Sequence, residues 1–263
     1  MPNITITHAD SGLVAAEVVR TARVTPNMIR ITLGGDDLRR FEYRGFDQWF
    51  RLALPVSSPD DLARMPQKFG VGGYLSYLRI PKGHRPIVRN YTVRSFDEES
   101  RELDIDFVSH GTEGVAGPWA ASAEPGDRVA LIDQGCGWLG RASDWNLIVA
   151  DESALPAALG VLRDMPRDAT GHAIIELFDR RDEQPVDAPD GVTVHWVVRE
   201  GDPGSAALPL LRELEFPAGE PYAFAVGEQS LAAGARRHLV KERGLAKDRV
   251  TFSGYWRKGR AAG

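Results

Sequence analysis

The 263-residue sequence predicts two domains, an N-terminal antiparallel β-barrel followed by an α/β domain with a parallel sheet. Up to about residue 140 the apolar residues form short alternating segments, which is the pattern of half-buried strands. From about residue 144 strand-like segments alternate with helical ones, as in a parallel sheet covered on both faces. The glycine-rich, polar segment 134–144 separates the two patterns, so the expected domains are residues 1–140 and 141–263.

Six strands are expected in the N-terminal half, and closing them into a barrel would hide their edges. The strands are residues 14–24, 28–33, 48–54, 90–95, 103–108 and 128–132. The connection 55–86 is long and contains several prolines and glycines, so it predicts a loop or a broken helix. Long ordered connections of this kind often carry function.

The C-terminal half begins with a strand at residues 145–150, followed by a helix that runs to residue 162. Ser153 is the expected N-cap of this helix, and Pro156 falls in its first turn. Further strands are expected at residues 172–178, 192–198, 222–226 and 249–256. Helical patterns fill some of the gaps between them, which fits the crossover connections of a parallel sheet.

Composition excludes several classes of protein. The formal net charge of −5 argues against a protein that neutralises nucleic-acid phosphates over its whole surface. Cys136 is the only cysteine, so the chain forms no internal disulfide and has too few thiolates for a zinc or iron–sulfur site. The six histidines show no pair at helical spacing, and we expect no metal site.

The N-terminal segment lacks the basic and apolar pattern of an export signal, and no window reaches the roughly 18 apolar residues of a membrane span. We therefore expect a cytoplasmic monomer without membrane insertion. Charge is uneven near the end, because residues 236–260 carry nine Arg and Lys against Glu242 and Asp248. A local anion site would explain this, but a solvated helix face is the favoured interpretation.

The densest chemical signal is RNYTVR at residues 89–94, within a strand pattern. Alternation puts Arg89, Tyr91 and Val93 on one side of the strand and the other three residues on the opposite side. A flavin uses such groups: an aromatic ring stacks on it, a hydroxyl hydrogen-bonds its redox-active nitrogen and an arginine neutralises its pyrophosphate. The alternative is a β-hairpin with a buried tyrosine and surface arginines.

A second signal follows at residues 110–120, HGTEGVAGPWA. Its glycine-rich part, 111–117, leads to a helix that contains Trp119. Backbone N–H groups at the positive end of that helix would bind a pyrophosphate.

Six motifs in this order resemble the siderophore-interacting protein family, and together they cover nearly the whole chain. They are RPIVRNYTVR (85–94), HGTEGVAGPWA (110–120), ADESALPA (150–157), AVGEQ (225–229), ARRHL (235–239) and SGYWRKG (253–259). The resemblance implies the fold of the ferredoxin-NADP reductase superfamily, with an FAD-binding barrel and a nucleotide-binding-like α/β domain. It also implies FAD-dependent reduction of ferric siderophores, which releases iron.

Carried over position by position, Arg89 would contact the FAD pyrophosphate and Tyr91 would pack on the flavin. Thr92 would hydrogen-bond the ring nitrogen that accepts hydride, so Thr92 and Tyr91 are the expected catalytic residues. His110 and residues 114–117 would hold the phosphates and the adenosine end, although a role in ordering the loop fits His110 equally well. The remaining expected FAD contacts are Val93, Arg94, Gly114, Val115, Ala116, Gly117 and Trp119.

The resemblance places the nicotinamide of NAD(P)H at Ser153 and Glu228. Here ADESALPA takes the place of the glycine-rich loop of related reductases, yet Asp151 and Glu152 would repel a phosphate set against them. No G-x-G-x-x-G motif follows a strand, so the binding of NAD(P)H rests on the resemblance alone.

Ferric siderophores carry negative or strongly accepting oxygens, so cations are expected on the substrate side. Arg51 occupies a barrel-strand position where the family often has a basic residue near the flavin, and Arg257 and Lys258 are the other candidates. Many members have a Gly-Pro-Arg-Gly turn where this chain has QGCG at residues 134–137. The cation expected there is missing, which bears on the class of siderophore, and the role of Cys136 stays open.

The implied reaction begins with a hydride from NAD(P)H, or with single electrons from reduced ferredoxin, delivered to FAD. The electrons then pass singly to the ferric siderophore, and the metal leaves because Fe(II) binds siderophore oxygens far less strongly than Fe(III). In this reaction the side chains only position the cofactor and the substrate and neutralise their charges. Two alternatives stay open, a flavin or ferredoxin reductase of the same superfamily and a flavin- or siderophore-binding module without turnover. The absence of a G-x-G-x-x-G motif counts against a flavin or ferredoxin reductase. Thr92 counts against a binding module, because a protein without turnover does not need a hydrogen bond to the redox-active nitrogen.

Overall fold

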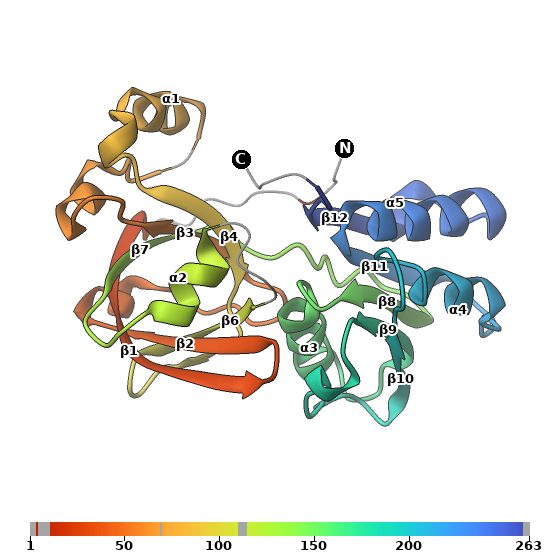
Figure 1. Cartoon of the computed structure of the whole chain (residues 1–263). Coiled ribbons are helices and arrows are strands. Elements are labelled where there is room, and N and C mark those ends of the chain that lie inside the picture. The colour runs from red at the N-terminus through yellow and green to blue at the C-terminus, as the bar shows by residue number, and fades with distance from the viewer. Residues whose placement is uncertain (1–3, 5–10, 69, 110–114, 260–263) are drawn as a thin grey trace. The chain divides into compact units, whose positions relative to one another are not determined.

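The structure is a computed structural model that describes residues 4, 11–68, 70–109 and 115–259. These residues divide into two compact units at Cys136 and Gly137, apart from the turn Thr25–Asn27, which groups with the second unit. The first unit contains an antiparallel sheet and the second a parallel sheet (Figure 1). The predicted fold class, an antiparallel β domain followed by a parallel α/β domain, is confirmed.

Within the described residues, the sheet of the first unit has seven strands. They are β1 (Leu13–Thr25), β2 (Met28–Gly34), β3 (Trp49–Leu54), β4 (Ile87–Thr92), β5 (Ser95–Asp97), β6 (Glu102–Val108) and β7 (Arg128–Asp133). Their order across the sheet is β4-β3-β7-β1-β2-β6-β5. β3 pairs antiparallel with β4 and β7, β1 with β7, and β6 with β2 and β5.

The chain between β4 and β5 closes this sheet. β4 and β5 are its two edge strands, and only Val93 and Arg94 separate them. The Val93 N–H donates to the Gln48 carbonyl beside β3 (2.8 Å), while the Arg94 N–H donates to the Asp104 carbonyl on β6 (2.8 Å). The predicted single strand 90–95 is therefore wrong in detail, because the chain changes its partner strand at this point.

Inward-facing side chains of these strands fill the barrel. Phe50 on β3 and both Ile105 and Phe107 on β6 are fully buried in this cluster. Helix α2 (Ala116–Ser122) packs on β2 and β6 through residues that include Ala116 (Figure 1). Removal of apolar surface from water, at about 25 cal/mol per Å², is the main stabilising contribution in such a cluster.

The long connection 55–86 is a broken helix, as predicted. It contains a 3₁₀ turn at Pro59–Arg64, helix α1 (Val71–Arg79) and a second 3₁₀ turn at Lys82–His84. The buried carboxylate of Asp61 ties the connection together, since it accepts the Ser57 N–H (2.8 Å) and lies 3.0 Å from His84 Nδ1. The backbone donors, led by Ser57, lower the pKa of Asp61.

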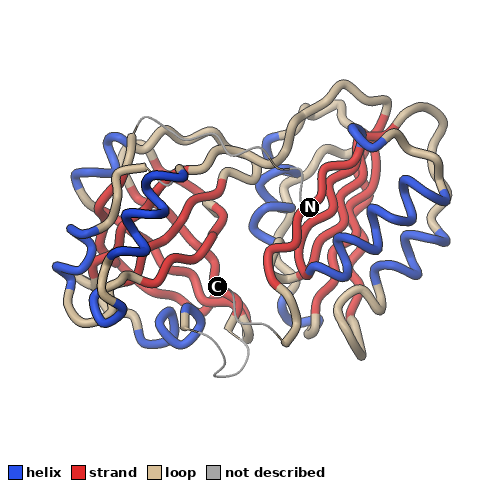
Figure 2. The backbone as a smooth tube through the Cα atoms, turned by 90° about the horizontal axis from the view of Figure 1, so that it is seen from above, coloured by secondary structure: helices blue, strands red, loops and turns tan. Residues whose placement is uncertain are grey.

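The second unit is a five-stranded parallel sheet within the described residues, in the order β10-β9-β8-β11-β12. Helices lie on both faces of this sheet (Figure 2), and none in the described residues is long and apolar enough to cross a bilayer. The strands are β8 (Trp145–Asp151), β9 (Thr170–Leu177), β10 (Gly191–Val198), β11 (Pro221–Glu228) and β12 (Val250–Trp256). The helices are α3 (Leu155–Asp164), α4 (Ala207–Glu213) and α5 (Gln229–Arg237).

Pairing of β9 with β10 brings together two histidines that are far apart in the sequence. His172 Nδ1 lies 3.2 Å from His195 Nε2, and burial lowers the pKa of both imidazoles. Helical spacing does not reveal this pair, because residues on neighbouring strands have no fixed separation in sequence. No group of three metal-ligating side chains occurs among the residues that the structure describes.

A buried ion pair ties β2 to β6. The Arg30 guanidinium binds both oxygens of Asp106 (2.7 and 2.9 Å), and Arg94 Nε lies 3.5 Å from the same carboxylate. The Asp106 side chain is fully buried, so its charge depends on these arginines. The nearby pair of Arg20 and Glu102 is largely exposed.

We predict that Asp106→Ala lowers the free energy of unfolding by roughly 3 kcal/mol, because the variant leaves Arg30 without its buried partner. The matched variant Glu102→Ala, at the exposed pair, should cost less than about 1 kcal/mol. Urea unfolding of both variants, monitored by circular dichroism, measures the difference. Equal effects of the two substitutions would contradict a special role of the buried pair.

Candidate cofactor and substrate site

The RNYTVR motif lies at the end of β4, where its aromatic residue joins a row of rings. The Tyr91 ring is 4.2 Å from that of Phe107 on β6, and Phe107 is 5.7 Å from the Trp119 ring on α2. Burial raises the pKa of the Tyr91 phenol, so this side chain stays neutral. Phe107 thus connects the two sequence motifs, a role that its position in an ordinary strand pattern did not reveal.

Arg89 presents a cation beside this row. Its side chain is half-buried, and one of its nitrogens donates to the Val88 carbonyl (2.8 Å). It forms no ion pair with any carboxylate in the described part of the chain. A half-buried guanidinium without a counter-charge fits an anionic ligand such as a pyrophosphate.

The Thr92 side chain lies on the face of the β3–β4 pair opposite to that of Tyr91, and Thr92 is directly across from Trp49 on β3. Thr92 is 7% exposed, and the Trp49 indole N–H is buried without a hydrogen-bond partner among the described residues. Buried donors are nearly always satisfied, so an open one beside a hydroxyl indicates a place for a ligand acceptor. The heteroatoms of a flavin ring fit this requirement. Trp49 was not among the predicted residues, because only the structure shows that its N–H lacks a partner.

The other predicted cofactor residues are placed less directly. The Val93 side chain is fully buried in the barrel interior, and the Arg94 guanidinium is beside Asp106. Val115 is 40% exposed at the start of α2, whereas Ala116 is buried and Gly117 is half-buried. His110 and Gly114 lie outside the described residues.

Arg51 on β3 is directly across from Asn90, two residue pairs along the strands from Trp49 and Thr92. Because side chains alternate along a strand, Arg51 shares its face of the sheet with Thr92 and not with Tyr91. Neighbours on the same face of adjacent strands lie within reach of one ligand. Burial lowers the pKa of the Arg51 guanidinium, which nevertheless stays charged at neutral pH.

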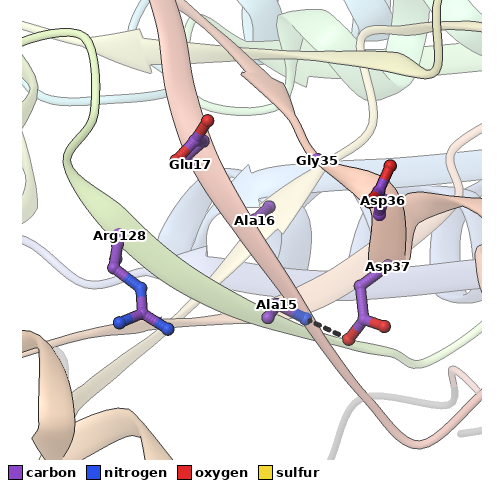
Figure 3. Close-up of a pocket in the computed structure, with 7 residues that line it drawn as sticks. All are labelled: Ala15, Ala16, Glu17, Gly35, Asp36, Asp37 and Arg128. Atoms are coloured by element: carbon purple, nitrogen blue, oxygen red, sulfur yellow. Dashed lines mark hydrogen bonds between the residues drawn. The ribbon is translucent and has the colours of Figure 1, made fainter.

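A hollow elsewhere on the barrel does not fit the cofactor. It is lined by Glu17, Asp36 and Asp37 together with Arg128, and Asp37 accepts the Ala15 N–H at 3.1 Å (Figure 3). Three carboxylates against one guanidinium would repel a pyrophosphate. None of the predicted flavin residues that the structure describes lines it.

At the carboxyl ends of the parallel strands, the second unit gathers buried acids. Asp151 ends β8 and Glu152 follows it, Glu176 lies on β9 and Glu228 ends β11, and each is at most 3% exposed. Arg199 binds both oxygens of Glu152 (2.5 and 2.6 Å) and lies 3.6 Å from Glu176. One guanidinium is therefore paired with two of these four buried carboxylates, Glu152 and Glu176.

Both carboxylate oxygens of Asp151 accept hydrogen bonds. One oxygen takes the Ser153 N–H and hydroxyl (3.0 and 2.5 Å), and the other takes the Glu228 N–H (2.6 Å) and the Trp256 indole N–H (3.0 Å). Burial and the neighbouring Glu152 raise the pKa of Asp151 to about 6. Gly227 has a φ of +123°, and a Cβ there would lie 2.6 Å from the Asp151 carboxyl carbon, so the site requires glycine.

Ser153 is not the N-cap of α3, contrary to the prediction. The cap is Ala154, with no side-chain hydrogen bond, because the Ser153 hydroxyl donates back to Asp151 instead. Pro156 does lie in the first turn, as expected.

The carboxylates also occupy the N-terminal ends of two further helices. Glu176 accepts the N–H groups of Gly204, Ala206 and Ala207 (2.6, 3.0 and 2.8 Å) at the start of α4. Glu228 caps α5 by accepting from the Ser230 N–H and hydroxyl. Burial acts to raise the pKa of Glu228, but these donors outweigh it and the pKa is lowered. Backbone donors that could bind a phosphate are thus already satisfied by the chain itself.

The two predicted cations near the C-terminus differ in their surroundings. The Lys258 ammonium forms an ion pair with Asp202, and its backbone N–H donates to Glu228 (3.1 Å). Arg257 is exposed.

Two arginines of the basic segment 236–260 pack on aromatic rings, while Arg237 and Arg257 are exposed. Arg236 lies over the Phe252 ring at 4.7 Å, and Arg243 lies over the Phe216 ring at 4.4 Å. Because both of these guanidinium groups pack on aromatic rings, neither is only a solvated charge on a helix face, which was the interpretation favoured from the sequence.

Cys136 is half-buried in the turn that follows β7. Its Sγ lies 3.6 Å from the Gly45 carbonyl, and the preceding Gly135 N–H donates to Asp133 (2.9 Å). The thiol in this turn therefore contacts the backbone of Gly45.

Two family models match the chain, the siderophore-interacting FAD-binding domain at residues 17–137 and the siderophore-interacting protein model at residues 143–259. The ferric vibriobactin reductase ViuB of Vibrio cholerae is 31% identical, over 93% of this chain and 89% of its own. The NADPH-dependent ferric-chelate reductase of Escherichia coli is 30% identical, over 91% of each chain.

Solved structures agree with these matches. A siderophore utilization protein from T. fusca superposes with a TM-score of 0.80 at 36% identity, covering 98% of this chain and 97% of that one. The siderophore-interacting protein SipS from Aeromonas hydrophila gives 0.75 at 30% identity, covering 95% and 93%. Because both family models and these relatives extend along nearly its whole length, the chain belongs to the siderophore-interacting protein family.

Proposed function

We propose that this protein is an FAD-dependent reductase of ferric siderophores that releases Fe(II) in the cytoplasm. The observation that carries the proposal is the end of β4. There, among the described residues, Arg89 has no carboxylate partner and the Trp49 indole N–H, opposite Thr92, has no hydrogen-bond partner. The names of the Vibrio cholerae and Escherichia coli relatives support the substrate class. Residues 1–140 would hold FAD, and residues 141–263 would serve the electron donor.

Each flavin-site residue has a distinct task in this proposal. Arg89 neutralises the pyrophosphate of FAD, and the Tyr91 ring, held by Phe107, supports the flavin face. The Thr92 hydroxyl and the Trp49 N–H hydrogen-bond the polar edge of the ring. When bound, FAD supplies the conversion between two-electron and one-electron chemistry.

Arg51 and Arg257 are the proposed contacts to the ferric chelate. Arg51 supports this role by sharing a sheet face with Thr92, so one ligand can lie against both. Arg257 contributes an exposed cation. Lys258 contributes less than the sequence implied, because its ammonium is paired with Asp202.

The proposed donor is NAD(P)H, by analogy with the name of the Escherichia coli relative, and reduced ferredoxin is the alternative. Ser153 and Glu228, the predicted nicotinamide residues, belong to the network around Asp151. Carboxylates already fill the N-terminal ends of α4 and α5 and the loop before α3. A dinucleotide would therefore bind without seating its pyrophosphate on these backbone donors, and a protein donor would not need them.

We predict that Arg89→Ala weakens FAD binding by about one to two decades, since a charge-assisted hydrogen bond is worth roughly 1.5–3 kcal/mol. Thr92→Val should keep FAD bound but slow its reduction. Isothermal titration with FAD and anaerobic stopped-flow reduction separate the two effects. Arg39→Ala, an exposed arginine of the same unit, is the control and should behave like the parent. Parent-like behaviour of both site variants would refute the assigned tasks.

We also predict that Arg51→Ala and Arg257→Ala each slow electron transfer to an anionic ferric chelate without slowing flavin reduction. Since attraction between charges is screened over about 8 Å at 0.15 M salt, the parent rate should fall as salt rises. Stopped-flow mixing of photoreduced protein with ferric catecholate and ferric hydroxamate complexes measures both effects. Normal rates in the two variants would show that the substrate binds elsewhere.

Carboxylates occupy the N-terminal ends of α4 and α5, and this leads to a prediction about how the electron donor NADPH binds. Inorganic pyrophosphate at about 1 mM should not compete with NADPH for reduction of the flavin, because the backbone N–H groups that would bind it already donate hydrogen bonds to carboxylates. A chloride salt of equal ionic strength controls for screening. Competitive inhibition by pyrophosphate beyond that control is the outcome that excludes this interpretation.

A further inference from the structure

Helix α1 exposes an apolar stripe to solvent. Val71 is 84% exposed, Tyr74 and Leu75 are each 50% exposed, and Leu78 is 41% exposed. The spacing of these four residues, i, i+3, i+4 and i+7, puts them on one side of the helix. No residue of α1 is buried, and the Tyr74 ring contacts the neighbouring Tyr77 ring (6.3 Å between ring centroids), so the stripe stays largely accessible to solvent.

Contacts on the other side of α1 fix this orientation. The Tyr77 hydroxyl donates to the Pro86 carbonyl (2.9 Å), and its ring packs on the cluster that contains Ala53. Arg85 donates to the carbonyls of Leu78 and Ile80 at the C-terminal end of α1 and lies over the Tyr77 ring. Tyr77 and the buried Ile80 therefore hold the inner side, and the stripe points outward.

The sequence segment that carries α1 is positively charged. Residues 62–96 contain seven Arg and Lys and no Asp or Glu, although the whole chain has a net charge of −5. Three of these cations are exposed beside or within the segment that carries α1, namely Lys68, Arg79 and Lys82. Figure 1 shows α1 standing out from the sheet of its unit.

We propose that α1 docks the protein on a lipid surface that carries anionic headgroups. A protruding apolar ridge inserts into a deformable interface, whereas a protein partner would require a matching groove. Lys and Arg beside the ridge bind acidic headgroups, and tyrosine is enriched at the boundary between headgroup and hydrocarbon. Because the helix is short and only four apolar side chains insert, the attachment is weak and reversible.

Co-sedimentation of the full-length, FAD-loaded protein with vesicles tests this docking. We expect binding to vesicles of phosphatidylcholine mixed with phosphatidylglycerol, and much weaker binding to phosphatidylcholine alone. Leu75→Ser should reduce the partition coefficient about tenfold, since it removes most of one inserted side chain. Lys82→Gln should reduce it about fivefold, and added salt should weaken binding of the parent.

The matched control is Leu139→Ser, which removes a leucine of similar exposure (42%) from the second unit and should bind vesicles like the parent. All variants should keep the flavin spectrum and the rate of ferric-chelate reduction without lipid, because none lies in the proposed site. No vesicle binding by the parent, or binding that Leu75→Ser leaves unchanged, would overturn the proposal. Self-association without vesicles that Leu75→Ser abolishes would also overturn it and identify the stripe as a contact between two copies.

Discussion

Carboxylates that are buried at strand ends and in connections must find donors within the chain, and both units are organised around this requirement. In the barrel, Asp106 is neutralised by Arg30 and lies beside Arg94, in the segment that closes the sheet. In the α/β unit, Asp151 and Glu176 take the backbone donors before α3 and α4. Without these donors each buried charge would cost several kcal/mol, so the loops around them can take few other conformations.

The need of buried carboxylates for donors within the chain distinguishes arginines with a structural role from those left to bind a ligand. Arg30 and Arg199 are committed to buried acids, whereas Arg89 makes no ion pair in the described part of the chain. Glu228 and Asp151 likewise use the backbone donors that a dinucleotide phosphate would need. The barrel therefore presents a place for an anionic cofactor, and the carboxyl edge of the parallel sheet presents none of the same kind within the described residues.

The sequence predicted the fold class and most strands, because alternation and the switch to helical spacing directly reflect burial on one face. The RNYTVR motif could be singled out from the sequence because its residue types are adjacent in the chain, and its role at the cofactor stays a prediction. The sequence failed where function depends on pairing between distant segments. Three features depend on register and tertiary packing, which no single-strand pattern encodes. They are the Trp49 N–H without a partner among the described residues, the packing of Phe107 between Tyr91 and Trp119, and the hydrogen bond from the Ser153 hydroxyl to Asp151.

The most direct test of the proposed activity is the stoichiometry of electron transfer from the protein to iron. The FAD-loaded protein is photoreduced without oxygen and mixed with a ferric siderophore in the presence of a ferrous chelator, and the absorbance of flavin and of the ferrous complex are followed together. We expect the flavin to reoxidise as the ferrous complex forms, with about two Fe(II) for each FAD, since the reduced cofactor carries two electrons. A flavin that stays reduced, or a protein whose released cofactor is not FAD, would contradict the proposed function.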